Sequence, residues 1–79
     1  MAGTASLRAL GAEIRARRQA KGLTQERLAD ISGLHRNFIG LIERGQQNPT
    51  FLTLVAISAK LGLPLSELMD GTESRGRSR

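Results

Sequence analysis

Four glycines divide most of this chain into segments that are too short for anything but small helices. Gly22, Gly33, Gly45 and Gly62 each follow a stretch of periodic apolar residues. Within these stretches the apolar residues recur at intervals of three and four, which is the period of an amphipathic helix. Glycine commonly ends a helix because it adopts the left-handed backbone conformation. We therefore predict an all-α domain built of short helices.

The glycines and two candidate N-cap threonines, Thr24 and Thr50, set the expected helix boundaries. A tight connection with Gly33 at its centre separates the second helix from the third. The predicted helices cover residues 7–21, 25–31, 35–44, 51–61 and 65–70. Together they form one domain over 7–71, preceded by a flexible arm at 1–6. The tail at 72–79 is basic and has no apolar side chain to bury, so we expect it to be disordered.

Composition excludes several classes of function. The 79 residues include no cysteine and a single histidine, so a disulfide scaffold, a thiolate metal site and a cysteine nucleophile are excluded. We find no paired carboxylates, phosphate-binding loop or metal-ligand cluster, and we expect no enzyme activity, no catalytic residue, no metal and no cofactor. No apolar run is long enough to span a membrane, so we expect a cytoplasmic protein with no membrane partner.

The charge points to a polyanionic partner. The net charge is +5, and ten of the 12 basic residues are arginine, whose forked guanidinium suits phosphates and base edges. The alternative is that this charge serves only solubility.

Two charged residues fall on apolar helix faces. Arg18 lies at the centre of the Leu7, Leu10 and Ile14 stripe, and Glu43 lies beside the inward face of the third helix. An unpaired charge in either place would be costly. We therefore predict a structural Arg18–Glu43 ion pair that joins the first helix to the third.

A run of motifs resembles the Cro and lambda-repressor-like helix-turn-helix family, often called the XRE type. The resemblance extends over about residues 10–71. It rests on these pieces at the family's spacing: Leu23-Thr24-Gln25, Leu28-Ala29, Gly33, Ile39, Ile42-Glu43-Arg44-Gly45 and Asn48-Pro49-Thr50. The resemblance implies a five-helix domain whose third helix enters the major groove of double-stranded DNA.

The resemblance also implies roles for individual residues. His35, Arg36, Asn37 and Leu41 match the positions that read bases, where Arg36 would take guanine, Asn37 adenine and Leu41 a thymine methyl. His35 has an alternative role in capping or packing at the start of the helix. The expected contacts to the DNA backbone come from Thr24, Gln25, Arg44, Gln47 and Asn48.

Three departures from the family pattern matter. The loop after Gly45 is Gln46-Gln47-Asn48 where the family often has Lys or Arg, so fewer phosphates would be neutralised. Arg17 occupies a position that is commonly apolar, which leaves the packing of the first helix open. Leu41 replaces a polar base reader, so it either contacts methyl groups or does not read a base.

A homodimer is the expected assembly, because one small module offers little contact area for DNA. In the fourth helix we assign Phe51, Leu54, Ile57 and Leu61 to the core. This leaves an apolar stripe for the dimer interface or, alternatively, for the intramolecular core: Leu52, Val55 and Ala59, together with Leu65 and Met69.

The resulting prediction is a sequence-specific transcriptional regulator of bacterial or phage origin, associated with the nucleoid. It would bind a pseudo-palindromic operator as a homodimer, as small phage repressors and restriction-modification controller proteins do. Activation would add a contact to RNA polymerase. The alternatives are a DNA-binding antitoxin with a partner protein, and an interaction adaptor that no longer binds DNA.

Overall fold

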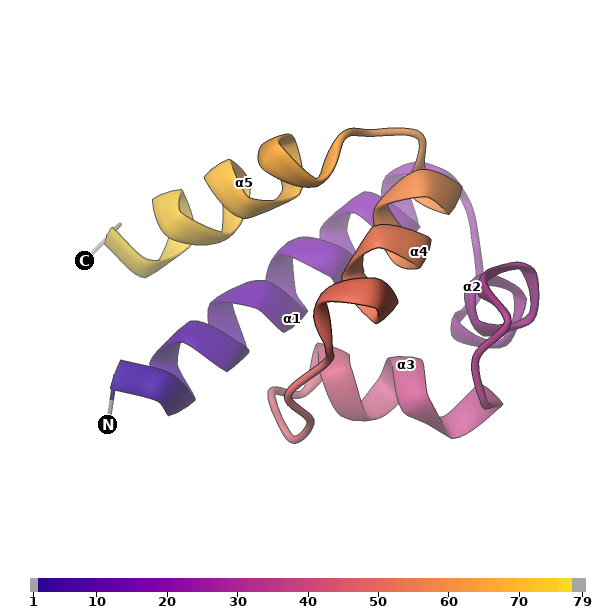
Figure 1. Cartoon of the computed structure of the whole chain (residues 1–79), viewed down its shortest axis with the longest axis horizontal. Helices are drawn as coiled ribbons and strands as arrows, with labels where there is room; N and C mark the ends of the chain where they lie inside the picture. Colours follow the sequence, from indigo (N-terminus) through magenta and orange to yellow (C-terminus); the bar gives the residue numbers. More distant parts are fainter. Residues whose placement is uncertain (1, 78–79) are drawn as a thin grey trace.

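The computed structural model describes residues 2–77, and this part of the chain contains five helices and no strand. In chain order they are α1 (Ala2–Ala20), α2 (Gln25–Ser32), α3 (Arg36–Glu43), α4 (Phe51–Leu61) and α5 (Leu65–Arg77) (Figure 1). The predicted all-α, five-helix architecture is therefore confirmed.

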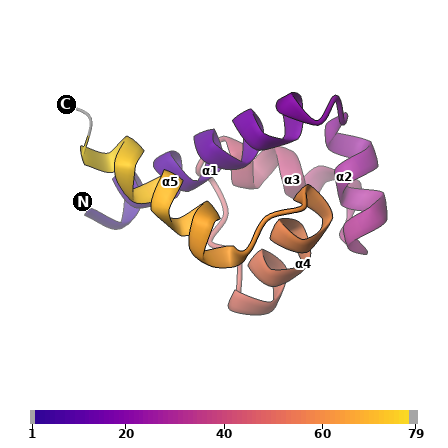
Figure 2. The ribbon, with the colours of Figure 1, turned by 90° about the horizontal axis from the view of Figure 1, so that it is seen from above.

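The longest two helices, α1 and α5, lie side by side and run in opposite directions. As a result, both ends of the described chain lie at the same end of the molecule in both views (Figures 1 and 2). The three remaining helices gather around the other part of α1. The molecule measures 33 × 21 × 21 Å.

Local signals form the middle helices. Thr24 Oγ1 accepts a hydrogen bond from the backbone N–H of Arg27, and Thr50 Oγ1 accepts one from that of Thr53. Gly33 then ends α2 with a φ of 71°, in the left-handed region that favours glycine. The boundaries of α2, α3 and α4 consequently fall within one residue of the predicted ones.

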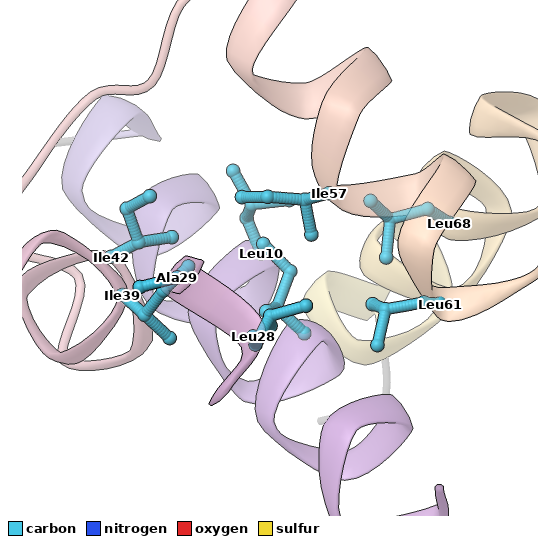
Figure 3. Close-up of a cluster of buried hydrophobic side chains, with 9 residues drawn as sticks. Leu10, Leu28, Ala29, Ile39, Ile42, Ile57, Leu61 and Leu68 are labelled. Atoms are coloured by element: carbon cyan, nitrogen blue, oxygen red, sulfur yellow. The ribbon is translucent and has the colours of Figure 1, made fainter. Parts of the chain in front are cut away.

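The core is aliphatic and takes residues from every helix (Figure 3). Its buried apolar members are Leu10, Ile14, Leu28, Ala29, Ile39, Ile42, Ile57, Leu61 and Leu68. Phe51 corrects one expectation, since 66% of it is exposed. It begins α4, and Figure 2 shows that the first turn of this helix protrudes beyond the others. Phe51 is therefore a surface residue and not part of the core.

Both terminal helices are longer than expected. Residues 2–6 belong to α1 instead of an arm, and residues 72–77 continue α5 instead of a disordered tail. Arg75 Nε donates a 2.7 Å hydrogen bond to Glu13 Oε1, and Gly71 lies directly against the Glu13 carboxylate. These contacts to α1 give the polar end of α5 a surface to pack on. Met1, Ser78 and Arg79 lie outside the described residues.

The length and composition of the helices can be compared with the expectation that no segment spans a membrane. α1 has 19 residues, of which five are charged. Between residues 2 and 77, no single helix combines the length and apolar character of a membrane span, and only α4 and α5 taken together, with a 100° bend between them, meet that test.

Candidate nucleic-acid interface

An open groove lies between the start of α2 and the outer face of α3. Its volume is about 360 Å³, and Gly40 forms part of its wall. The other lining residues are Gln25, Arg36, Asn37, Leu41 and Arg44. Three of the four predicted base readers and two of the five predicted backbone contacts are thus brought together on one surface.

The helical period of α3 explains this arrangement. Ile39 and Ile42 are completely buried, so the helix is held by this face against the core. Arg36 and Asn37 lie on the opposite side and are exposed, whereas Leu41 is half-buried. The polar and apolar faces of α3 are therefore separated as the sequence predicts.

His35 lies outside the groove and caps α3. Its Nδ1 accepts a hydrogen bond of 3.2 Å from the backbone N–H of Asn37. Of the two roles considered for His35, the structure contains the capping role, while its contact with bases stays a prediction.

The predicted ion pair between α1 and α3 is present. Arg18 Nε lies 2.6 Å from Glu43 Oε2, and Arg18 Nη2 lies 3.1 Å from Glu43 Oε1. The side chains are only 10% and 2% exposed, respectively. Arg18 Nη1 also donates to the carbonyl oxygen of Leu23, so the guanidinium is bound on three sides.

Glu43 has a second partner that sequence reasoning missed. Gln25 Nε2 donates a 2.9 Å hydrogen bond to Glu43 Oε1. The side chain of Gln25, which we had assigned to a DNA phosphate, is consequently fixed at the groove by the same carboxylate that holds Arg18. In the sequence, only two features point to this bond: Gln25 is polar and begins the second expected helix, and Glu43 is an acid beside the inward face of the third.

The other predicted backbone contacts lie outside the groove lining. The hydroxyl of Thr24 serves as the cap of α2, while Gln47 and Asn48 belong to the loop after α3. Arg44 Nε donates to Gln46 Oε1 at 3.0 Å, which steadies its side chain at the groove.

One carboxylate approaches the predicted base readers. Arg36 Nη2 lies 3.9 Å from Glu26 Oε2, and both side chains are well exposed. An exposed ion pair of this kind contributes little, about 0–1 kcal/mol, so it leaves Arg36 able to change partners.

A second ionic network, which we did not predict, joins α1 to α5. Glu13 is buried and accepts hydrogen bonds from Arg17 and Arg75, while Arg17 Nη1 also reaches Glu67 Oε2 at 2.9 Å. Burial acts to raise the pKa of Glu13, but the bonds from Arg17 and Arg75 outweigh it and hold the pKa below its usual value. Arg17 is therefore accommodated in α1 by its ion pairs with Glu13 and Glu67.

The exposed apolar surface on α4 differs from the predicted dimer stripe. Leu52 is 74% and Val55 38% exposed, as a surface stripe requires. Leu65 and Met69 pack against the core and are partly exposed, as the intramolecular alternative expects, while their place in a dimer interface stays a prediction. We call the exposed residues Phe51, Leu52 and Val55 the α4 patch.

Within residues 2–77, no three His, Asp or Glu side chains are grouped as metal ligands.

Comparisons with known proteins agree with this geometry. A helix-turn-helix family model matches residues 14–68. Control protein C.SmaI of Serratia marcescens is 40% identical over 60 residues, which cover 76% of this chain and 71% of that protein. The immunity repressor of Bacillus phage phi105 is 37% identical over 60 residues, 76% of this chain and 42% of the repressor.

Solved structures show the same relationship. The restriction-modification controller protein C.AhdI from Aeromonas hydrophila superposes with a TM-score of 0.77 and 40% identity, covering 78% of this chain and 94% of that one. The clp gene regulator ClgR from Corynebacterium glutamicum gives a TM-score of 0.87 at 25% identity, covering 90% and 76%. The chain therefore belongs to the XRE-type helix-turn-helix family of DNA-binding transcriptional regulators.

Proposed function

We propose that this protein is a sequence-specific transcriptional regulator that acts in the cytoplasm as a homodimer on a pseudo-palindromic operator. The observation that carries the proposal is the groove at α2 and α3, where Arg36, Asn37 and Leu41 face outward together. Helix α3 would lie in the major groove, with α2 crossing the backbone.

The chemistry of the outward face suits base edges. The guanidinium of Arg36 offers a bidentate contact to guanine, and the amide of Asn37 offers one to adenine. Leu41 supplies an apolar contact for a thymine methyl. The start of α2 presents free N–H groups and the positive end of its dipole to a phosphate, beside Thr24 and Gln25. Arg44, Gln47 and Asn48 would contact the backbone at the other end of α3.

The α4 patch supports the homodimer. Phe51 and Leu52 are large apolar side chains exposed next to one another on the protruding turn of α4. Adjacent exposed apolar side chains of this kind commonly mark a protein contact. The proposed dimer requires that a second copy packed through this patch place two α3 helices about one helical turn of DNA apart.

Selection from random duplex DNA tests the proposed operator. We expect the wild-type protein to enrich a two-fold symmetric motif whose half-sites are separated by about 10 bp. Enrichment of no motif, with weak binding governed only by salt, would contradict the proposal and favour an adaptor that works through a protein partner.

Sedimentation equilibrium tests the dimer. Leu52→Glu places a charge in the α4 patch at a position that has little packing to lose, so we expect a folded monomer that binds one half-site weakly. Lys60→Glu, on the exposed side of the same helix, is the matched control. A dimer of unchanged strength in Leu52→Glu would place the interface elsewhere.

A further inference from the structure

The arginines of α1 extend the basic surface beyond the helix-turn-helix. Arg8 and Arg15 are both exposed, and neither forms an ion pair with a carboxylate in the described part of the chain. Arg17, Arg18 and Arg75 are all bound to acids instead. The free positive charge of α1 is therefore concentrated at Arg8 and Arg15.

Arg15 lies beside Arg44 at the edge of the predicted reading surface, and Arg8 lies beside the next residue, Gly45. Arg15 lines a shallow hollow of about 250 Å³ together with Arg18, Gln25, Glu43 and Arg44. Gln25 and Arg44 also line the groove at α3, so the two hollows are neighbours that share these two residues. On the other side, Arg8 packs against Gly45, where a Cβ atom would lie only 2.9 Å from Arg8 Cγ. Arg8, Arg44 and Arg15 thus form one row, which we call the α1 row.

The carboxylate in this neighbourhood does not cancel the charge of the α1 row. Glu43 lines the same hollow, but its oxygens are occupied by Arg18 and Gln25. Glu13, the single acidic residue of α1, is bonded to Arg17 and Arg75. Arg8, Arg15 and Arg44 have no ion pair in the described part of the chain, so an anion that approached the α1 row would displace none.

We propose that the α1 row binds the phosphate backbone of DNA outside the contacts made by α2 and α3. This inference rests on the proposed function, since the α1 row lies beside the α3 groove and the same duplex would supply the phosphates. Arg8 and Arg15 are seven residues apart on one helix, or about 10 Å, which equals the axial rise of about three phosphates on one strand. The two residues thus reach separate phosphates and replace the charge that the loop Gln46-Gln47-Asn48 lacks.

The salt dependence of DNA binding tests this proposal. Arg8→Gln, Arg15→Gln and the double variant are titrated with the wild-type enriched duplex and with a scrambled duplex over a series of salt concentrations. Each lost phosphate contact lowers the slope of log K against log salt by about 0.9, so the double variant should lose about 1.8. Because phosphates carry no sequence information, we expect the same loss on both duplexes and an unchanged enriched motif.

Two controls keep the result interpretable. Lys60→Gln removes one charge from α4 and should leave the slope of log K against log salt unchanged. The double substitution of Arg8 and Arg15 by Lys keeps both charges and should retain most of the wild-type slope. Thermal melting confirms that each variant is folded. If the Arg8→Gln, Arg15→Gln double variant has the same slope as Lys60→Gln, the proposal that the α1 row binds phosphates is wrong. Failure of the wild type to enrich a motif would instead contradict the sequence-specific function, and the scrambled duplex would still test the row.

Discussion

The carboxylate of Glu43 connects three helices of this protein. This carboxylate binds Arg18 from α1 and Gln25 from α2, and Glu43 is the last residue of α3. The pair with Arg18 was predictable because both charges fall on apolar helix faces, where neither would be stable alone. The bond from Gln25 was not, because helical periodicity says nothing about which way a polar side chain at the start of a helix turns.

Removing Glu43 should destabilise the fold strongly. Glu43→Ala leaves the guanidinium of Arg18 buried without its counter-charge, a change that typically costs about 3–5 kcal/mol. Chemical denaturation measures the free energy of unfolding directly. Asp30→Ala is the control, because it breaks the exposed pair with Arg27 and should cost less than about 1 kcal/mol. Equal effects of the two substitutions would contradict the structural role of Glu43.

Gly11 allows α1 to approach the end of α3 closely. A Cβ atom built there overlaps the carbonyl oxygen of Ile42 and lies 2.6 Å from that of Glu43. Since these are backbone atoms at a helix end, they cannot move aside as a flexible side chain would. Gly11→Ala should therefore lower the melting temperature although alanine favours helix.

Gly76 provides the matched control for that measurement. It also lies in a helix, but a Cβ atom there has no neighbour within 4 Å. Gly76→Ala should consequently be neutral or stabilise the protein by up to about 1 kcal/mol. A Gly11→Ala protein at least as stable as Gly76→Ala would show that the α1–α3 approach is looser than described.

At the scale of the elements, the predictability of each helix depended on where its stabilising contacts lie. The helices α2, α3 and α4 carry their own caps and glycine stops, so their boundaries followed from local sequence. The start of α1 and the end of α5 have no such signals, and the end of α5 is held by contacts to residues about 60 positions away, such as that of Arg75 with Glu13. A reading of local pattern consequently predicted a flexible arm and a disordered tail.

The network at Glu13 should make the packing of α5 on α1 sensitive to acid. Because the pKa of Glu13 is lower in the folded protein than in the unfolded chain, its stabilising contribution is complete above the unfolded value, about 4.3, and is lost as the pH falls through the folded value. The melting temperature of the wild type should exceed that of Glu13→Gln at neutral pH. This difference should shrink as the pH falls below the unfolded value.

The exposed Asp70 on α5 supplies the comparison for this pH series. Asp70→Asn removes an exposed carboxylate with no ion pair among the described residues, so it should change the melting temperature little. A difference between wild type and Glu13→Gln that stays constant into acid would mean that the carboxylate is not held ionised by Arg17 and Arg75.

At the scale of the whole molecule, the groove assembled largely as predicted because the motif that specifies it is contiguous in sequence. Arg36, Asn37 and Leu41 lie on α3, where the helix period places them together, and Arg44 directly follows this helix. The α4 patch was only partly predictable. Leu65 and Met69 have the spacing of a surface stripe, but the docking of α5 on the core buries part of each, and no local pattern reveals that docking.

The central claim is that α3 reads bases, and the most direct measurement is the affinity of Arg36→Ala for every single-base variant of the enriched duplex. We expect the loss of preference to be confined to one base pair in each half-site and to amount to about 1–3 kcal/mol there. Lys60→Ala, on α4, should leave the whole profile unchanged. A uniform weakening across all variants, or no change at all, would contradict the assignment of α3 as the helix that reads the DNA sequence.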